Sequence, residues 1–131
     1  MKYYGLTLNL RDDAKTIEEY KTYHRAMWPE VEESLRRAGV LTLRIFLGAR
    51  QLFMYMEAGD DFDPATYVSE YLREPRAAEW ESLMQQMQEP VAYAKPGEWW
   101  TFLEPIYALG SNSRDGVSST NGGGLSSSAQ T

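Results

Sequence analysis

The sequence predicts a single α+β domain in which helices cover one face of an antiparallel sheet. Alternating apolar residues over 2–10 predict an opening β-strand. Two apolar, β-rich runs follow at 40–47 and 51–57, and the short link between them has the length of a hairpin turn. Apolar residues at helical spacing precede and follow this pair. The predicted order is therefore strand, helix, two strands, helix, strand.

Bulk composition restricts both size and function. The chain has 131 residues, which suits one domain. Its formal net charge of -6 argues against a nucleic-acid partner, because binding phosphates requires a clustered Lys/Arg surface. The absence of cysteine excludes disulfides, zinc–thiolate sites and a cysteine nucleophile. The N-terminus does not have the pattern of a signal peptide and no segment is apolar enough to span a membrane, so we expect a cytoplasmic protein without a membrane partner.

The composition changes sharply near Gly110. From there to Thr131 the chain is rich in Ser, Gly, Asn and Thr, and Val117 and Leu125 are its only large apolar residues. Such a segment cannot bury enough surface to offset the entropy lost on ordering. We therefore predict a folded domain over residues 1–109 and a disordered tail over residues 110–131.

The first half of the domain contains a strand and a broken helix. On the strand, one face carries Tyr4, Leu6, Leu8 and Leu10. Thr16 is a candidate N-cap with Glu19 completing a capping box, and the helix is expected to end near Ala26. Trp28-Pro29 then interrupts the apolar stripe, because proline cannot donate a hydrogen bond to the preceding turn. A second helix is predicted from there to Ala38, with Gly39 as its C-terminal stop.

The second half follows the predicted hairpin. Asp63 is expected to cap a helix that begins at Pro64 and carries Tyr67, Val68 and Tyr71. Glu74-Pro75 breaks this helix, and another is predicted from about Pro75 to Met87. The last strand is predicted over Trp99–Tyr107, with an indole of Trp99-Trp100 on each face.

This order of elements is that of the split βαβ, ferredoxin-like arrangement. Helices cover one face of its sheet, and the other face is left open in a monomer. We expect the apolar row that contains Tyr4, Leu6 and Leu8 to lie on the open face, where it would not remain exposed to water. Packing of two such sheets predicts a homodimer.

His24 is the only histidine and lies on the apolar stripe of the broken helix. Two interpretations are open: a structural histidine with a satisfied hydrogen bond, or a general acid/base whose ordinary pKa suits proton transfer near neutral pH. Tyr20 lies one turn earlier on the same face, where it would pack in the core or bind a hydroxyl group. Trp80 would pack in the core or stack on a sugar ring.

Other kinds of site find no support in the sequence. One histidine with carboxylates at no ligand-like spacing does not predict a metal site. The glycines are isolated and form no phosphate-binding loop, and no serine lies in a nucleophile-elbow context. We therefore expect a site of His, Tyr and Trp that works without a metal or a cofactor.

The segment from Glu19 to Glu30, EYKTYHRAMWPE, resembles the L-rhamnose mutarotase family. That family has a block of the type E-Y-x-x-x-H-N-x-x-W-P-E after its first strand, and the resemblance continues to the closing segment Glu104–Tyr107. It covers about residues 3–108. The resemblance implies a dimeric α/β barrel of ferredoxin-like subunits that interconverts the α and β anomers of an L-6-deoxyhexopyranose, a monosaccharide, without a cofactor.

The resemblance also implies roles for single residues. His24 matches the family's proton donor, Tyr20 matches a tyrosine that contacts the sugar, and Trp80 matches the second member of a Trp-Trp pair that binds substrate. Three positions depart from the pattern, since the first Trp is replaced by Glu79, a second sugar-contacting tyrosine by Leu43 and the asparagine after the histidine by Arg25. These departures leave L-fucose, or another deoxysugar, as open a substrate as L-rhamnose.

Mutarotation requires a proton on the ring oxygen and the loss of one from the anomeric hydroxyl. His24 would supply the first, while Tyr20 or a water would handle the second. Two other classes remain open on this architecture. One is a cofactorless monooxygenase or lyase of the dimeric α/β barrel type, and the other is a non-catalytic dimeric binding module.

Overall fold

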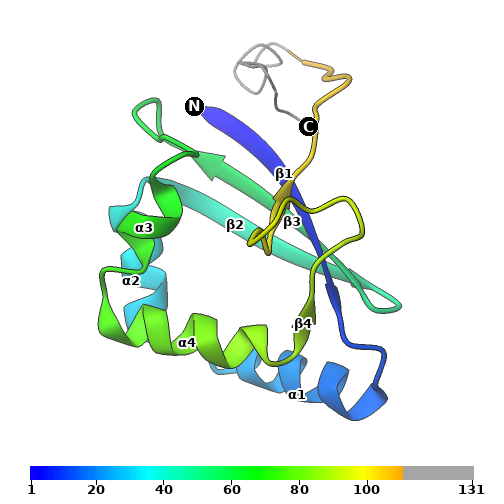
Figure 1. Cartoon of the computed structure of the whole chain (residues 1–131). Coiled ribbons are helices and arrows are strands. Elements are labelled where there is room, and N and C mark those ends of the chain that lie inside the picture. The colour runs from blue at the N-terminus through cyan, green and yellow to red at the C-terminus, as the bar shows by residue number, and fades with distance from the viewer. Residues whose placement is uncertain (111–131) are drawn as a thin grey trace.

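The computed structural model describes residues 1–110 and confirms the α+β class. Its five-stranded antiparallel sheet has the order β2-β3-β1-β4, and β5 also pairs with β1 (Figure 1). The elements in chain order are β1 (Lys2–Leu10), α1 (Ala14–Arg25), α2 (Pro29–Arg37), β2 (Val40–Gly48), β3 (Gln51–Ala58), α3 (Tyr67–Tyr71), α4 (Pro75–Gln85), β4 (Gln88–Glu89) and β5 (Thr101–Phe102). The tail predicted over residues 110–131 lies outside the described residues, apart from Gly110.

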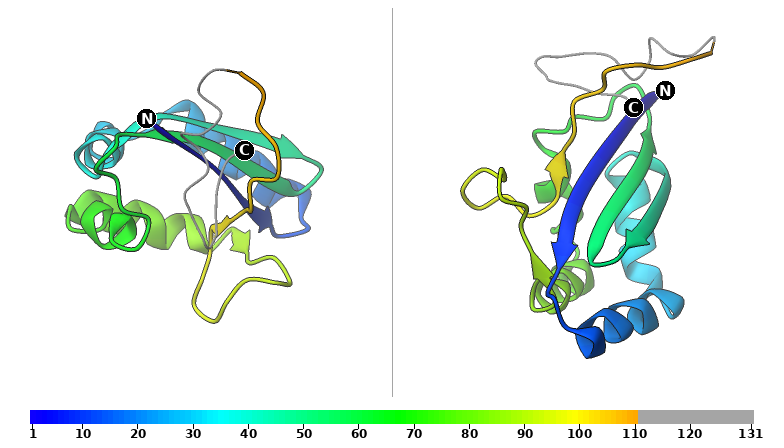
Figure 2. Two further views of the ribbon diagram at one scale, coloured as in Figure 1. Left: turned by 90° about the horizontal axis from the view of Figure 1, so that it is seen from above. Right: turned by 90° about the vertical axis from the view of Figure 1, so that its right-hand side faces the viewer.

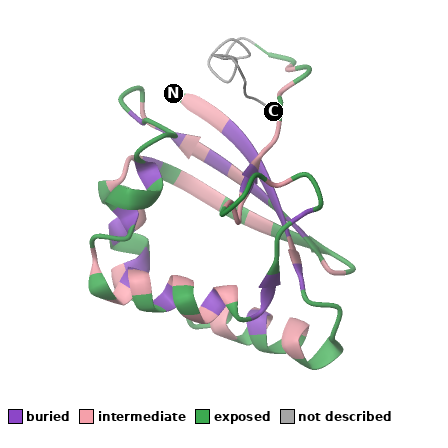
Figure 3. Ribbon diagram, viewed as in Figure 1, coloured by how far each residue is buried: buried purple, intermediate pink, exposed green. Residues whose placement is uncertain are grey.

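The core lies between the sheet and the helices. Leu6 of β1 pairs with Met54 of β3, which pairs in turn with Ile45 of β2. Side chains of this row pack with residues from α2, α3 and the segment before α3. Figure 3 shows the buried residues along β1 and along one side of α4.

This packing corrects one prediction. Tyr4, Leu6 and Leu8 are buried in the monomer on the helix-covered face, so they do not form the open face of the sheet. Alternation along a strand shows which residues share a face, but the neighbouring helices decide which face is covered. The opposite row of the sheet includes Phe46 and Phe53, whose rings stack with centroids 6.3 Å apart. No helix covers β1, β2 and β3 on the side facing the viewer in the right-hand view of Figure 2.

Helix α1 begins earlier than predicted. Asp13, not Thr16, is its N-cap, and the Asp13 carboxylate accepts hydrogen bonds from the Thr16 backbone N–H at 3.2 Å and from its hydroxyl at 2.6 Å. The prediction of a capping box formed by Thr16 and Glu19 was therefore wrong. A carboxylate three residues before Thr16 is as good an N-cap as a threonine hydroxyl, and choosing it adds a turn to the helix.

The predicted break after α1 is confirmed. Trp28 has extended backbone angles, φ -72° and ψ 130°, and Pro29 opens α2. The stop after α2 is also confirmed, because Gly39 adopts φ +103°, a left-handed conformation that other residues rarely take.

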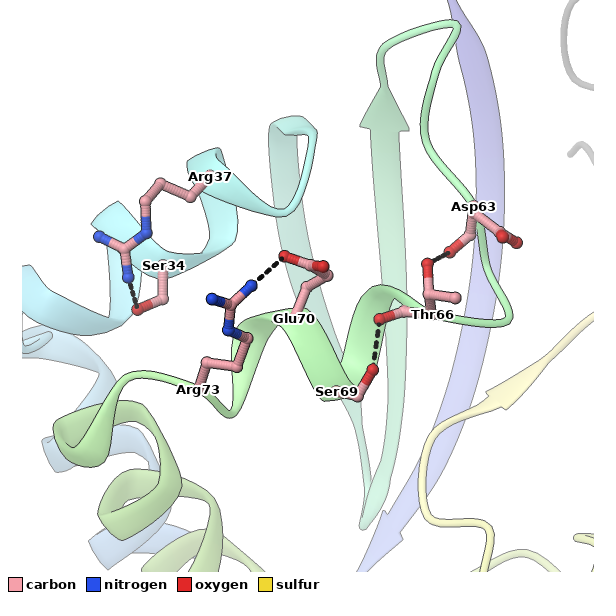
Figure 4. Close-up of polar contacts among 7 residues, drawn as sticks. All are labelled: Ser34, Arg37, Asp63, Thr66, Ser69, Glu70 and Arg73. Carbon is pink, nitrogen blue, oxygen red and sulfur yellow. Dashed lines mark hydrogen bonds and ion pairs between the residues drawn. The ribbon is translucent and has the colours of Figure 1, made fainter.

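Helix α3 is shorter than predicted. Asp63 forms a turn in which its side chain accepts from the Ala65 backbone N–H at 2.9 Å, and the helix proper begins at Tyr67. Figure 4 shows the polar contacts on this side of the molecule, including the Ser69 hydroxyl on the Thr66 carbonyl and the ion pair of Arg73 with Glu70. Helix α4 begins at Pro75 as predicted and ends at Gln85, before the predicted Met87.

The last part of the sheet differs from the prediction. Two short strands, β4 and β5, pair with different parts of β1, whereas a single strand over Trp99–Tyr107 was predicted. Pro90 directly follows β4, and Pro105 follows β5 closely; a proline has no N–H to donate to a neighbouring strand. Two short strands, β4 and β5, therefore share the position beside β1, and a loop joins them.

We predict that Gly39→Ala lowers the free energy of unfolding by about 1–2 kcal/mol, because alanine would have to adopt the left-handed backbone conformation. The added Cβ would also lie 3.3 Å from the Phe62 ring. Gly48→Ala is the matched control, since a Cβ there meets no atom within 4 Å. Urea unfolding of both variants measures the difference, and equal stabilities would contradict the assignment of Gly39.

Candidate active site

A cavity of about 450 Å³ opens between the sheet and helices α1, α2, α3 and α4. Its apolar lining includes Leu6, Leu43, Ile45 and Met54 from the strands. Its polar lining comes mainly from the helices and β4, and consists of Tyr20, His24, Tyr67, Tyr71, Glu81, Gln85, Gln88 and Glu98. The three predicted site residues, Tyr20, His24 and Trp80, all lie on this cavity.

His24 lies in the last turn of α1 and is half-buried. Its Nδ1 lies 2.9 Å from the backbone oxygen of Tyr20, one turn earlier. Nδ1–H donating to this carbonyl leaves the lone pair of Nε2 free to accept a proton. Burial lowers the pKa of His24 below its ordinary value, and the hydrogen bond to Tyr20 opposes that effect. Burial therefore makes the imidazolium easier to deprotonate than a histidine in water.

Trp80 holds the ring of His24 from the side of α4. Its indole packs edge-on against the imidazole, with centroids 5.2 Å apart, and against Trp28 at 5.1 Å. Tyr20 also contacts His24, with ring centroids 4.4 Å apart. Arg76 lies over Trp28, its guanidinium carbon 3.8 Å from the ring centroid. Because Trp80 is 3% exposed, it is a core residue as well as part of the cavity wall.

The hydroxyl of Tyr20 is positioned by Gln88. The Gln88 side-chain amide donates to this hydroxyl at 3.1 Å, and Gln88 is 5% exposed. Within residues 1–110, Gln88 Oε1 is a buried side-chain atom without a hydrogen-bond partner. Burial raises the pKa of Tyr20, and the bond from Gln88 opposes this only partly, so the phenol stays protonated. Gln88 was not among the predicted site residues, because strand β4, which carries it, was not predicted.

Glu81 is the second residue that sequence analysis missed. It follows Trp80 on α4 and lines the cavity, and the hydroxyl of Tyr71 on α3 donates to its Oε2 at 3.3 Å. Burial raises the pKa of Glu81, and the hydrogen bond from Tyr71 acts in the opposite direction. Its position gave a usable signal. Glu81 lies four residues after Ala77 and three before Met84, which places a carboxylate on the apolar stripe of the helix.

The three departures from the family pattern have different locations. Leu43 lines the cavity from β2, where it offers no hydroxyl group. Glu79 is exposed and its carboxylate pairs with Arg76 at 2.8 Å. Arg25 is exposed and contacts the Thr22 hydroxyl at 3.4 Å. Of the three, only Leu43 changes the cavity wall.

Trp99 and Trp100 lie just before β5, and both line the cavity. The predicted placement of the two indoles on opposite sheet faces was therefore wrong. Within residues 1–110, no group of three His, Asp or Glu side chains could hold a metal ion. The helices in the same range include none that is long and apolar enough to cross a membrane.

The arrangement can transfer protons to and from a bound hydroxylated molecule. His24 and Glu81 both titrate, whereas Tyr20 and Gln88 can only exchange hydrogen bonds with a ligand. The apolar strand residues provide a surface for the carbon skeleton of that ligand. The cavity volume is in the range usual for small-molecule sites.

Comparison with known proteins gives a consistent result. The sequence profile of the L-rhamnose mutarotase family matches residues 3–109. An L-fucose mutarotase of Xanthomonas campestris is 40% identical over 104 residues, which cover 78% of this chain and 83% of that protein.

Two solved structures share the fold. A crystal structure of an L-rhamnose mutarotase from Formosa agariphila superimposes with a TM-score of 0.62 at 19% identity, over 84% of this chain and 100% of that one. The tetracenomycin F2 cyclase of Streptomyces glaucescens, a type-II polyketide cyclase, superimposes with a TM-score of 0.57 at 18% identity, over 85% of this chain and 99% of that one. Identities this low show the fold alone, which is the ferredoxin-like fold of dimeric α/β barrels.

The family profile covers nearly all of the described residues, and it includes the segment that carries Tyr20, His24 and Trp28. The chain belongs to the L-rhamnose mutarotase family, whose members are isomerases that act on sugars.

Proposed function

We propose that this protein interconverts the α and β anomers of an L-6-deoxyhexose, L-fucose or L-rhamnose, with His24 as an acid/base residue. The observation that carries the proposal is the position of His24. Its ring borders a cavity of about 450 Å³, and Tyr20 and Trp80 hold it in place. Tyr20 and Trp80 are the proposed substrate-binding residues.

The chemistry follows from the structure of a pyranose. Ring opening places a proton on the ring oxygen and removes one from the anomeric hydroxyl. The aldehyde group then rotates, and the ring closes on the other face with the protons moving back. His24 exchanges a proton with the ring oxygen through Nε2, since Nδ1 is held by the Tyr20 carbonyl. The Tyr20 hydroxyl and Trp80 indole orient the sugar.

The apolar wall supports a deoxysugar. The C6 methyl group of a 6-deoxyhexose needs an apolar neighbour, and Leu6, Leu43 and Met54 provide one. L-Fucose is the first sugar to test, because the Xanthomonas relative is an L-fucose mutarotase. L-Rhamnose is the second. The polar groups contributed by α1, α4 and β4 favour a hydroxylated ring over the flat aromatic substrate that a monooxygenase or cyclase of this fold would take.

We also propose that the protein is a homodimer in which two sheets pack through their open faces. On that face the Phe46 and Phe53 rings are stacked and 56% and 37% exposed, and Tyr3 stacks on Tyr55 beside them with centroids 6.4 Å apart. An aromatic patch of this kind is usually covered in a soluble protein. These residues replace Tyr4, Leu6 and Leu8 as the proposed interface.

The function is tested by saturation-transfer NMR between the two anomeric protons of L-fucose and of L-rhamnose. We expect the protein to accelerate exchange for at least one of these sugars. D-Glucose is the control sugar, since it has a hydroxyl at C6 and belongs to the D series. If the protein accelerates exchange of no 6-deoxyhexose, the proposed activity is wrong.

His24→Asn should reduce the acceleration by ~10²–10⁴-fold, the usual contribution of one positioned acid/base group. Asparagine keeps a polar group at this position but cannot transfer the proton. Arg25→Ala is the neighbouring control, because Arg25 is exposed and does not line the cavity. Full exchange activity in His24→Asn would remove His24 from the mechanism.

Phe53→Asp should convert the dimer into a monomer, because it buries a charge in the proposed sheet–sheet interface. Tyr93→Asp is the control, since Tyr93 is 64% exposed and lies outside the sheet. Light scattering coupled to gel filtration measures the mass of each variant. A wild-type protein that is monomeric at micromolar concentration would contradict the dimer.

A further inference from the structure

Ring opening needs two groups that exchange protons, and His24 is only one of them. The other titratable groups on the cavity are Tyr20, Tyr67, Tyr71, Glu81 and Glu98. The three tyrosines have pKa values raised by burial, so none of them ionises near neutral pH. The Glu98 carboxylate accepts from the backbone N–H of Lys95 at 2.9 Å and is committed to the loop before β5. Glu81 is the group that remains.

We propose that Glu81 is the second acid/base residue of the site, exchanging a proton with the anomeric hydroxyl while His24 exchanges one with the ring oxygen. This inference rests on the proposed mutarotase function and deepens it. It assigns to a carboxylate the role for which sequence analysis considered only Tyr20 or a water.

The geometry of α4 supports this assignment. Glu81 directly follows Trp80, whose indole contacts the imidazole of His24 with centroids 5.2 Å apart. Both titratable side chains line one cavity, His24 from α1 and Glu81 from α4. The Tyr71 hydroxyl donates to Glu81 Oε2 at 3.3 Å, which orients the carboxyl and leaves Oε1 for a ligand.

The surroundings of Glu81 suit a group that both gives and takes a proton. Tyr67 and Tyr71 of α3 and Tyr20 of α1 face it, and Glu81 raises the pKa of each of them. None of the salt bridges within the described residues involves Glu81. Burial raises the pKa of Glu81 and lowers that of His24, so the two values approach each other. Moving a proton between groups of similar pKa costs little free energy.

The proton balance closes without any other reactant. In one direction the Glu81 carboxylate takes the proton of the anomeric hydroxyl, the C1=O bond forms, and the bond between C1 and the ring oxygen breaks. The ring oxygen takes a proton from the imidazolium of His24. The pair then holds its one proton on Glu81, and ring closure on the other face returns it. Neutral His24 with protonated Glu81 is thus the arrangement that closes the ring, because His24 takes the proton from the former ring oxygen while Glu81 returns one to the carbonyl oxygen at C1.

The test compares Glu81→Gln with Glu70→Gln by the same anomeric-exchange measurement. Glutamine keeps the size and the hydrogen bond to Tyr71 but cannot take a proton. We expect a loss of ~10²-fold or more in kcat for Glu81→Gln, with a smaller change in KM. Glu70 is an exposed carboxylate on α3 that pairs with Arg73, and its variant should match the wild type (Figure 4).

Two further readouts separate a catalytic role from a structural one. The wild type should have a bell-shaped pH dependence of kcat/KM, because the pair must hold one proton in total, and Glu81→Gln should lose the acidic limb. Added formate should restore part of the exchange to Glu81→Ala but none to Glu70→Ala, since formate can occupy the space left by the carboxyl.

The outcomes distinguish the two proposals. If the wild type accelerates exchange and Glu81→Gln matches it in rate and pH profile, the role of Glu81 is wrong and the mutarotase function stands. The same conclusion holds if Glu81→Gln is slow but keeps both pH limbs and Glu81→Ala gains nothing from formate. If the wild type itself accelerates no 6-deoxyhexose, the proposed function fails first.

Discussion

The site depends on one constraint, the burial of Trp80. This residue belongs to α4, and its indole packs against α1, a helix much earlier in the sequence. Its indole contacts rings from α1 and from the segment between α1 and α2, namely Tyr23, His24 and Trp28. These edge-to-face contacts join the C-terminal end of α1 to α4 near the bottom of the molecule in Figure 1. Because aromatic pairs prefer this geometry, the contact fixes the direction of the imidazole as well as its position.

The interruption at Trp28-Pro29 makes that contact available. A continuous helix through these residues would carry Trp28 onward along the axis, whereas the break turns the chain and leaves Trp28 against Trp80. The same break places His24 near the end of α1, at the border of the cavity. One proline thus determines both the aromatic cluster and the access of the histidine to a ligand.

Much of the fold could be predicted from the sequence, because its signals are local. The β1 alternation, the hairpin, the Pro29 break and the Gly39 stop each depend on a few adjacent residues. The prediction of one long last strand over Trp99–Tyr107 was wrong, because the pairing with β1 is divided between β4 and the short β5. The prediction that Tyr4, Leu6 and Leu8 lie on the open face of the sheet was also wrong, because the positions of α2, α3 and α4 decide which face is covered.

The candidate site shows the same division. Tyr20, His24 and Trp80 carry local signals, a helical stripe and a resemblance over a short block. Gln88 could not be predicted because its role depends on the cavity that it reaches, whereas Glu81 was missed although its carboxylate falls on the apolar stripe of α4. The role of Gln88 is clear only in the structure, where β4 places its side chain on the hydroxyl of Tyr20, a residue 68 positions earlier in the chain. The structure shows that the Glu81 carboxyl accepts a hydrogen bond from the Tyr71 hydroxyl and that Glu81 lines the cavity.

The most direct measurement is an NMR titration of the His24 ring, whose signals are unambiguous because the chain has one histidine. A desolvated imidazole on the cavity wall should titrate below the ordinary value of about 6.5, and the urea-unfolded chain should titrate at that value. Saturating L-fucose or L-rhamnose should move the ring signals of the folded protein. An ordinary pKa in the folded protein, with signals that neither sugar moves, would contradict the account.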